Sequence, residues 1–444
     1  MTATGNAARG RRAIAAAALG NALEWYDFTV FALFAIPIAH AFFPDEDGTI
    51  AVFKAFLAFG VGFVARPLGA VLIGLYADAR GRKAALSTTI LLMAAGTLLI
   101  AVTPGYASIG LAAPALLVAG RLLQGLSAGG EIGGAAAFLV EQAPPGARAR
   151  HAAWLQASMA LSNIAGALVA FAVNSLLAPE DVAAWGWRLP FVIGLLIAPV
   201  GLWLRSHLSE TEAFATAQAE EAHAGAVSTR LWRLLRSYPS ALALGFGISV
   251  LWAVSVYALV IFLPVHVQRA LGMSGSDAFA ASLVANAIFA PACLLFGRLG
   301  DRCGQRLLLF AGAGSLAALT VPLMAWLAAE SSLPVLVIVQ SLFCIQIAAF
   351  SACAPAALAE LFPTAVRASG MSIAYNAATT IFGGFAPAIL TWFAARGAGP
   401  LAPGWYVAAA ALIGLATVAA LPAARFPLRL RSRALPDVLE TQTR

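Results

Sequence analysis

The sequence predicts an all-α membrane protein with twelve transmembrane helices in two pseudo-symmetric halves, and three observations support this. The chain has 444 residues, of which 61% are hydrophobic and only 11% charged, whereas about 25% are charged in soluble proteins. The apolar residues form runs long enough to cross a bilayer, which takes roughly 20 residues per helix. Two loop motifs recur at nearly equal separations, and no run shows the alternation of barrel strands.

The runs follow one another with short polar loops between them. We expect twelve spans, at residues 13–40, 51–75, 84–104, 109–139, 152–178, 187–204, 240–268, 276–297, 307–328, 334–361, 368–395 and 404–424. The longest polar stretch lies between the sixth and seventh runs. We therefore predict an N-terminal six-helix bundle over 1–204, a cytoplasmic linker over 205–237, and a C-terminal six-helix bundle with a cytoplasmic tail over 238–444.

The net charge of +7 reflects membrane topology. With the N-terminus inside, most basic residues fall in loops on one side, and only Lys54, Arg188, Arg269 and Arg396 fall on the other. Cytoplasmic loops of membrane proteins carry such an excess of Lys and Arg. We expect both termini in the cytoplasm of a bacterium, an inner-membrane location, a retained first helix, and no nucleic-acid partner.

Two charged motifs repeat between the halves. Gly74–Lys83 and Gly297–Arg306 both read G-x-x-x-D-x-x-G-x-(K/R), and each half also has a Glu followed seven residues later by an Arg. Parallel repeats are a common plan of secondary transporters. We expect these loops to form a cytoplasmic gate, with each Asp also able to cap a neighbouring helix; its residues are Asp78, Arg80, Arg82, Glu141, Arg148, Asp301, Arg302, Glu360 and Arg367. The alternative is that they only orient helices.

The first half carries charged residues within its apolar runs. Glu24 and Asp27 lie in the first run, Arg66 in the second, and Arg121 and Glu131 in the fourth. Ionisable residues inside a membrane are costly and by default mark a functional site. Glu24 has an alternative role as an anchor at the inner interface. Small residues around Arg121–Glu131 let neighbouring helices approach closely.

Uncharged polar residues complete the candidate site. Gln124 lies one turn after Arg121, and further candidates for a substrate pocket lie in the fifth, seventh and eleventh runs: Gln156, Asn163, Tyr257, Tyr375 and Asn376. Any one of them could instead be a satisfied packing residue. The four cysteines lack metal-ligand spacing, and we expect no metal, no cofactor and no disulfide. The sequence shows no nucleophile–base grouping typical of an enzyme and no signalling domain typical of a receptor.

Several motifs together resemble a known family. Gly74–Lys83 resembles the signature loop of the major facilitator superfamily, and Arg121–Gly125 its fourth-helix motif. The segments GNALEWYDF, RPLGA, RLLQGLSAGGEIGGAAAFLVEQAPPG and WGWRLPF are similar to the metabolite:proton symporter family. That family includes carriers of citrate, α-ketoglutarate, shikimate and proline/betaine. IFGGFAPAI and PGWY look most like the citrate and α-ketoglutarate members. One departure is Ala79, where the family usually has arginine after the loop aspartate.

The resemblance implies a proton-coupled symporter that works by alternating access. We expect Arg66 and Arg121 to engage carboxylates of a di- or tricarboxylate, because a guanidinium donates two parallel hydrogen bonds. Asp27 or Glu131 would carry the coupled proton, with Glu24 and Arg121 beside it. A zwitterionic osmolyte such as proline or betaine, or a shikimate-like acid, is the alternative substrate, and uniport or antiport the alternative cycle. The expected partners are this organic ion, protons and the lipid bilayer, with the chain as a monomer.

Overall fold

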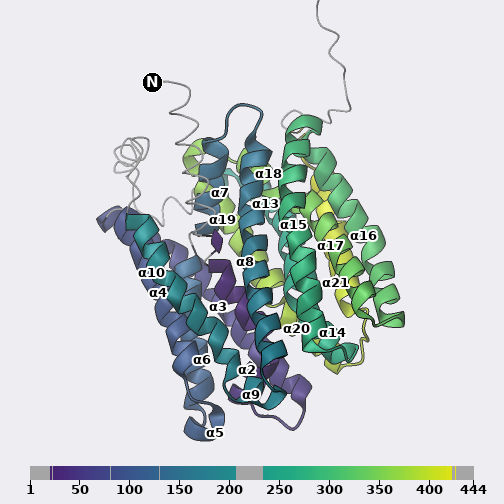
Figure 1. Ribbon diagram of the computed structural model, residues 1–444. Helices are drawn as coiled ribbons and strands as arrows, with labels where there is room; N and C mark the ends of the chain where they lie inside the picture. Colours follow the sequence, from purple (N-terminus) through teal and green to yellow (C-terminus); the bar gives the residue numbers. More distant parts are fainter. Residues whose placement is uncertain are drawn as a thin grey trace, which may run out of the picture.

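The computed structural model describes residues 21–22, 24–80, 82–129, 131–206, 234–422 and 426, which are mainly helical. Figure 1 shows long helices side by side, with the purple-to-blue part of the chain on one side and the green-to-yellow part on the other. Eight described helices are long and apolar enough to cross a membrane, and a bent pair makes a ninth. The helices α4, α10 and the α6–α7 pair occupy the remaining three predicted spans.

The first half opens with helix Glu24–Leu33, which is bent by 70° from α2 (Ala35–Phe42). Pro37 explains the bend, because a proline clashes with the carbonyl four residues before it, here that of Leu33. The later helices of this half are α3 (Gly48–Arg80), α4 (Arg82–Val102), α5 (Tyr106–Ile109), α6 (Ala112–Ala128), α7 (Glu131–Glu141), α8 (Arg148–Leu176), α9 (Pro179–Ala184), η1 (Gly186–Arg188) and α10 (Leu189–Ser206).

The second half repeats long helices with two irregular breaks. Its elements are α13 (Pro239–Val256), η2 (Tyr257–Phe262), α14 (Leu263–Ala270), α15 (Gly275–Cys303), α16 (Gln305–Ala329), α17 (Leu333–Ser351), α18 (Ala354–Leu361), η3 (Thr364–Val366), α19 (Arg367–Ala378), η4 (Thr379–Gly384), α20 (Ala386–Ala395) and α21 (Ala402–Ala419). Both η2 and η4 are π-helical and are followed closely by Pro264 and Pro387. A π turn widens the helix where proline removes a backbone donor.

Glycines allow the helices of the first half to approach closely around the charged residues. An added Cβ at Gly125 would lie 1.8 Å from the Gly62 carbonyl oxygen, and one at Gly129 would lie 2.0 Å from that of Arg66. The backbones of α6 and α3 therefore touch, and any larger residue would separate them. This contact brings Arg121 on α6 and Arg66 on α3 into the same part of the half.

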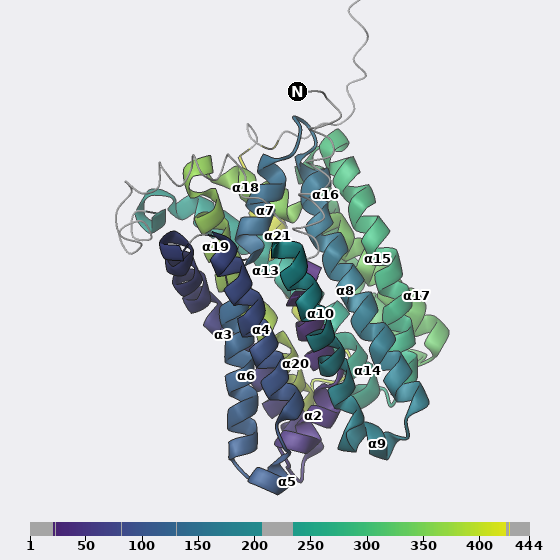
Figure 2. The same cartoon turned by 60° about the vertical axis from the view of Figure 1, so that its left-hand side comes forward.

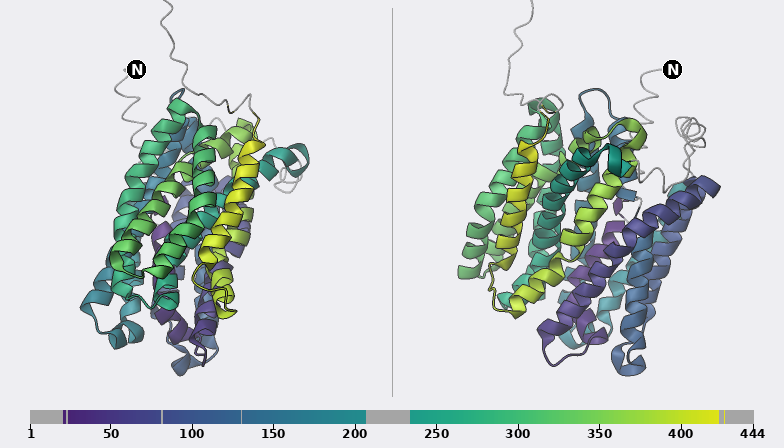
Figure 3. Two further views of the ribbon diagram at one scale, coloured as in Figure 1. Left: turned by 90° about the vertical axis from the view of Figure 1, so that its right-hand side faces the viewer. Right: turned by 180° about the vertical axis from the view of Figure 1, so that it is seen from behind.

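The two halves meet along long seams. α8 runs along α15, while α7 packs against α19, and α3 against α20 and η4. Figure 2 shows α8 alongside α15 from a second direction, and the rear view in Figure 3 shows the first half beside the second again. The end that carries α7, α18 and the start of α8 is called the inner end here, because its loops are the ones predicted to be cytoplasmic; the other is the outer end.

Candidate functional site

A buried ion pair joins the first two predicted spans. Arg66 Nη2 lies 3.2 Å from Glu24 Oε1, and the two side chains are 1% and 2% exposed. The Arg66 guanidinium also lies 4.7 Å from the ring centre of Phe28 and 4.4 Å from that of Phe63. Within the described part of the chain, Arg66 Nε and Nη1 have no hydrogen-bond partner. One edge of this guanidinium is therefore held by protein, and donors remain for another anion.

A second charged group lies in the same half and forms a continuous chain of hydrogen bonds. Arg121 Nη1 donates to Gln124 Oε1 at 2.6 Å, and Gln124 Nε2 donates to Thr97 Oγ1 at 2.9 Å. Thr97 Oγ1 in turn donates to Asp27 Oδ2. All four side chains are buried. Arg121 and Asp27 are thus linked indirectly, through an amide and a hydroxyl from two other positions.

Aromatic rings surround the Arg121 guanidinium. It lies 4.6 Å from the ring centres of Phe28 and Phe31 and 4.9 Å from that of Phe59, and its Nη2 donates to the Phe59 carbonyl at 3.3 Å. Electron-rich ring faces attract a cation and compensate in part for lost hydration. Phe28 contacts both arginines, so the two charged groups share one ring.

The second half faces this region with aromatic residues. Tyr257 packs against Phe63 and Trp25, with ring centres 5.3 and 5.7 Å apart. Its ring lies over the π-helical η4, where a Cβ on Gly383 would come within 2.8 Å of it. The buried Tyr257 hydroxyl has no partner among the described residues. Tyr375 is also buried, and its ring packs 4.7 Å from that of Trp252.

A buried polar thread crosses the α8–α15 seam. Thr29 Oγ1 donates to Asn163 Oδ1 at 2.7 Å, and Asn163 Nδ2 donates to Asn286 Oδ1 at 3.1 Å. Gln156, about two turns before Asn163 on the same face of α8, is 2% exposed, and its Nε2 lacks a partner in the described chain. Asn163 therefore contacts the other half directly, whereas Gln156 keeps a donor that another group can use.

The inner end is closed by crossed ion pairs between the halves. Arg367 Nη1 lies 2.8 Å from Glu141 Oε1, and Arg148 Nη1 lies 3.5 Å from Glu360 Oε1. Asp301 Oδ1 and Oδ2 accept the backbone N–H groups of Ala149 and Arg150 at 2.9 and 3.0 Å, so Asp301 caps α8 of the opposite half. Asn376 adds a further contact, since its Nδ2 donates to the Gly129 carbonyl at 3.0 Å. Arg302 is exposed.

The outer end also holds the halves together. Arg269 Nη2 donates to Thr49 Oγ1 at 2.8 Å, and the rings of Phe56 and Phe262 pack 5.5 Å apart. Midway along α3, one turn before Arg66, Thr380 Oγ1 donates to the Phe63 carbonyl at 3.0 Å. The halves therefore touch at both ends and also beside Arg66, where Phe63 contacts Thr380 and Tyr257 of the second half.

Some predicted site residues cannot be placed. The side chains of Glu131, Asp78, Arg80 and Arg82 lie outside the described residues, and their proposed roles stay predictions. Gln124, predicted to bind substrate, lies between Arg121 and Thr97 and hydrogen-bonds to both, and its substrate role stays a prediction. Among the described residues, no group of three His, Cys, Asp or Glu is arranged to hold a metal ion.

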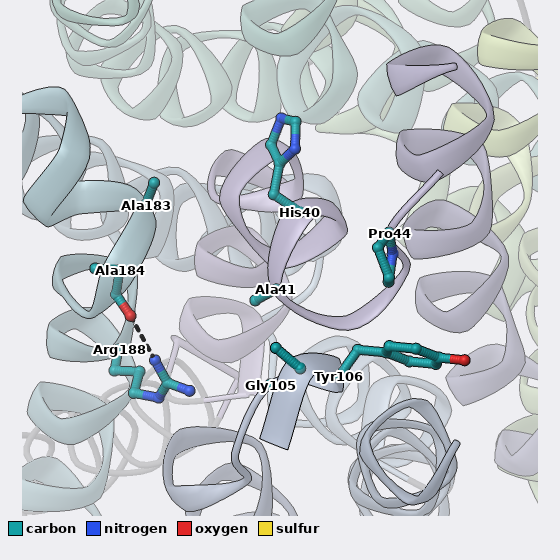
Figure 4. Close-up of a pocket in the computed structure, with 9 residues that line it drawn as sticks. His40, Ala41, Pro44, Gly105, Tyr106, Ala183, Ala184 and Arg188 are labelled. Carbon is teal, nitrogen blue, oxygen red and sulfur yellow. Dashed lines mark hydrogen bonds between the residues drawn. The ribbon is translucent and has the colours of Figure 1, made fainter. Parts of the chain in front are cut away.

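A surface pocket lies apart from the buried charges, at the outer end. It has a volume of about 290 Å³ and is lined by His40, Ala41, Pro44, Gly105, Tyr106, Ala107, Ala183, Ala184 and Arg188 (Figure 4). Its arginine is already engaged: Arg188 donates to the carbonyls of Ala184 and Thr103 at 3.1 and 3.0 Å. Arg188 thus connects α9 to the end of α4. Its role in this pocket is therefore structural.

Sequence reasoning missed two parts of the site. The first is Thr97, an isolated hydroxyl in an apolar run that gives no signal of its own. The second is the set of aromatic residues around the arginines. A signal for these existed, because Phe28 and Phe31, and Phe56, Phe59 and Phe63, recur at the three- and four-residue spacing that places side chains on one helical face.

Comparisons with known proteins agree on the family and fold. The profile described as Major Facilitator Superfamily matches residues 17–345. A citrate-proton symporter of Salmonella typhi is 37% identical over 408 residues, which cover 90% of this chain and 92% of that protein. A Staphylococcus aureus protein with the provisional name proline/betaine transporter is 31% identical over 416 residues, 93% of this chain and 88% of that protein.

A solved structure shows the same architecture. The xylose transporter XylE from E. coli, in a partially occluded inward-open conformation, superposes with a TM-score of 0.71. The match covers 93% of this chain and 98% of that one at 17% sequence identity. At this identity the likeness concerns the fold: twelve helices in two halves.

Proposed function

The chain belongs to the Major Facilitator Superfamily, within its metabolite:proton symporters, and from this premise we propose that it carries a small di- or tricarboxylate together with protons. Citrate is the first candidate, because the Salmonella typhi relative is named for it. One observation carries the proposal. Arg66 is buried between the halves' aromatic residues, yet two of its nitrogens have no partner in the described chain.

Substrate recognition follows from the geometry of Arg66. With Glu24 on Nη2, the Nε and Nη1 donors remain for a carboxylate, and charge-assisted hydrogen bonds of this kind are among the strongest in proteins. Tyr257 contributes a hydroxyl from the other half, and Gln156 an amide N–H. A ligand held between Arg66 and Tyr257 would contact both halves, which an alternating-access cycle requires.

Proton coupling is assigned to Asp27. It is 5% exposed, linked to Arg121 only through Thr97 and Gln124, and separate from the Glu24–Arg66 pair. An aspartate that is not directly paired with an arginine can take up and release a proton without breaking a buried ion pair, so no arginine loses its direct partner. Glu131 remains a second proposed carrier on the sequence argument alone.

The remaining assignments concern topology. As a member of this superfamily with several apolar helices, the chain is a multi-pass inner-membrane protein. We propose that both termini are cytoplasmic, that residues 205–237 connect the two bundles at that face, and that the carrier acts as a monomer. The crossed Glu141–Arg367 and Arg148–Glu360 pairs then form the cytoplasmic gate, which opens when they separate.

Transport in proteoliposomes tests the proposal. With an inward proton gradient, labelled citrate should accumulate, and unlabelled α-ketoglutarate should compete better than betaine, proline or shikimate. Arg66→Lys should reduce accumulation at least tenfold, because a lysine lacks the planar fork. Arg396→Lys, the same exchange at an exposed site, is the matched control. Citrate accumulation that is the same with and without the proton gradient would contradict proton symport.

A zwitterionic osmolyte is the second candidate. It is favoured by the Staphylococcus aureus relative and by the aromatic residues Trp25, Tyr257, Trp252 and Tyr375, since aromatic faces bind quaternary ammonium groups. A thermal-shift screen of the purified carrier separates the candidates. Stabilisation by betaine and not by citrate would replace the first assignment.

A further inference from the structure

The hydrogen-bond chain between Arg121 and Asp27 has a fixed direction. Arginine has only donors, so the oxygen of the Gln124 amide must face it. The amide nitrogen of Gln124 then faces Thr97 and donates to its hydroxyl oxygen, as the 2.9 Å contact shows. Thr97 has one hydroxyl hydrogen, which is thereby directed at Asp27 Oδ2. The direction of each hydrogen bond in this series is therefore fixed by the hydrogen bond before it.

The consequence falls on Asp27. Its Oδ2 already accepts a hydrogen bond and is held as an acceptor whether the carboxyl is charged or neutral. Its Oδ1 has no partner among the described residues. That oxygen points at α10, where a Cβ built on Gly194 would lie 2.8 Å from Oδ1 and 3.2 Å from the Tyr26 ring.

We propose that the coupled proton binds Asp27 at Oδ1, on the side of α10, and that Thr97 is the positioning residue that reserves this oxygen. A hydronium ion transfers its proton to Oδ1 and leaves as water, and the carboxylate becomes a neutral acid. The inference rests on the proposed role of Asp27. It adds the oxygen atom that binds the proton and the side from which the proton approaches. It also gives Thr97 the role of holding Oδ2 as an acceptor, and Gly194 the role of leaving space beside Oδ1.

The surroundings of Asp27 agree with this. The charged and titratable groups facing it are Arg121 from α6, reached through the hydrogen-bond chain, and the neighbouring Tyr26, whose hydroxyl donates to the Pro190 carbonyl at 3.0 Å. α4 presents Thr97, and α10 presents the backbone at Gly194. The Glu24–Arg66 pair lies on the substrate side. In this proposal the proton binds the oxygen of Asp27 that faces α10, whereas the substrate binds at the Glu24–Arg66 pair, which involves α3.

Infrared difference spectra of the purified carrier between acidic and basic pH test the assignment without a substrate. A carboxylic-acid C=O band absent from Asp27→Asn identifies Asp27. If the proton sits on Oδ1, the C=O oxygen is Oδ2 and accepts from Thr97. Thr97→Val, which keeps the shape but lacks the hydroxyl, should then move this band to higher wavenumber, and Thr97→Ser should leave it in place. A band that does not move in Thr97→Val overturns the proposal.

Transport supplies the second readout. Gly194→Ala places a methyl group against Oδ1, and Gly134→Ala, with open space around it, is the matched control. Gly194→Ala should cut proton-driven citrate accumulation about tenfold or more, while citrate exchange at equal pH falls less than twofold. Equal loss of both activities overturns the access role. If no Asp27-dependent band appears at any pH, the proton role of Asp27 itself fails, whereas its presence with an unmoved band refutes the Oδ1 assignment alone.

Discussion

The interiors of the two halves differ in charge although their inner ends match. The first half buries Glu24, Asp27, Arg66 and Arg121, whereas the described residues of the second half bury no Asp, Glu, Lys or Arg. At the inner end each half instead offers one Glu and one Arg to the other. The repeat has therefore kept its symmetry where the halves meet. Among the described residues, the buried carboxylates and guanidinium groups all belong to the first half, and the second half faces them with aromatic rings and hydroxyl groups.

The largest expected effect comes from removing a charge within the first half. Arg66→Gln leaves Glu24 buried without its arginine, and breaking a buried ion pair on one side costs about 3–5 kcal/mol. We expect a clear fall in the thermal unfolding midpoint in detergent, together with loss of transport.

The double variant Glu24→Gln/Arg66→Gln separates the two effects. It removes both charges, so stability should recover while transport stays lost. A single variant that is as stable as the wild type would show that the pair does not carry its charge in the folded carrier.

The role of the second half, which buries no charged residue among those described, is tested by Tyr257→Phe. The buried hydroxyl lacks a partner among the described residues, so its removal should leave the unfolding midpoint unchanged or slightly higher. A hydrogen bond to a charged group contributes about 1.5–3 kcal/mol, so citrate affinity should fall roughly tenfold or more. The comparison between the halves fails if the variant loses stability and keeps affinity, as measured by thermal shift and calorimetry.

The fold could be predicted from sequence because its physical signals are strong. The apolar runs follow from the cost of placing unpaired polar groups in lipid, and the repeated loop motifs are typical of two similar halves. The structure shortens or divides some predicted spans: a bend interrupts the first run at Phe34, and the fourth run is divided into α6, which ends at Ala128, and α7, which begins at Glu131. Apolar composition alone does not determine where a helix bends.

The candidate site was predictable only in part. Charged residues in apolar runs stand out because they are expensive, which identified Glu24, Asp27, Arg66 and Arg121. Their pairing was not predictable, since two acids and two arginines allow several arrangements and the choice depends on helix rotation. The contribution of Thr97 depends on the packing of α4 against α6, which brings its hydroxyl to Gln124. Likewise, the crossed pairing of Glu141 with Arg367 depends on how the halves dock.

The two crossed ion pairs at the inner end, the proposed gate, should show a smaller effect, and an unequal one. Arg367 is 14% exposed and 2.8 Å from its Glu, whereas Arg148 is 51% exposed and 3.5 Å away. Partly exposed ion pairs contribute about 0.2–1 kcal/mol. Arg367→Ala should therefore raise inner-side opening roughly two- to fivefold, and Arg148→Ala less.

Maleimide labelling of Ser372→Cys in a chain without its native cysteines measures this opening. Ser372 lies opposite Gly133 at the α7–α19 contact, so its labelling rate reports separation of the halves. The charge-exchanged double variant Glu141→Arg/Arg367→Glu should return the rate toward the starting value. If Arg148→Ala opens the seam more than Arg367→Ala, the ranking by exposure and distance is wrong.

The smallest effect is expected from the exposed pair of Lys54 and Asp45 at the outer end, 2.7 Å apart, which serves as the solvent-exposed counterpart of Glu24–Arg66. The hydrogen bond from Lys54 lowers the pKa of Asp45 below its ordinary value. Because the folded-state pKa is the lower one, the pair stabilises the fold fully above the unfolded value of about 4 and loses this contribution as pH falls through the folded value. Lys54→Met should therefore lower the unfolding midpoint slightly at pH 7 and converge with the wild type in acid. An offset that is the same at every pH would mean that Lys54 acts by packing and not by charge.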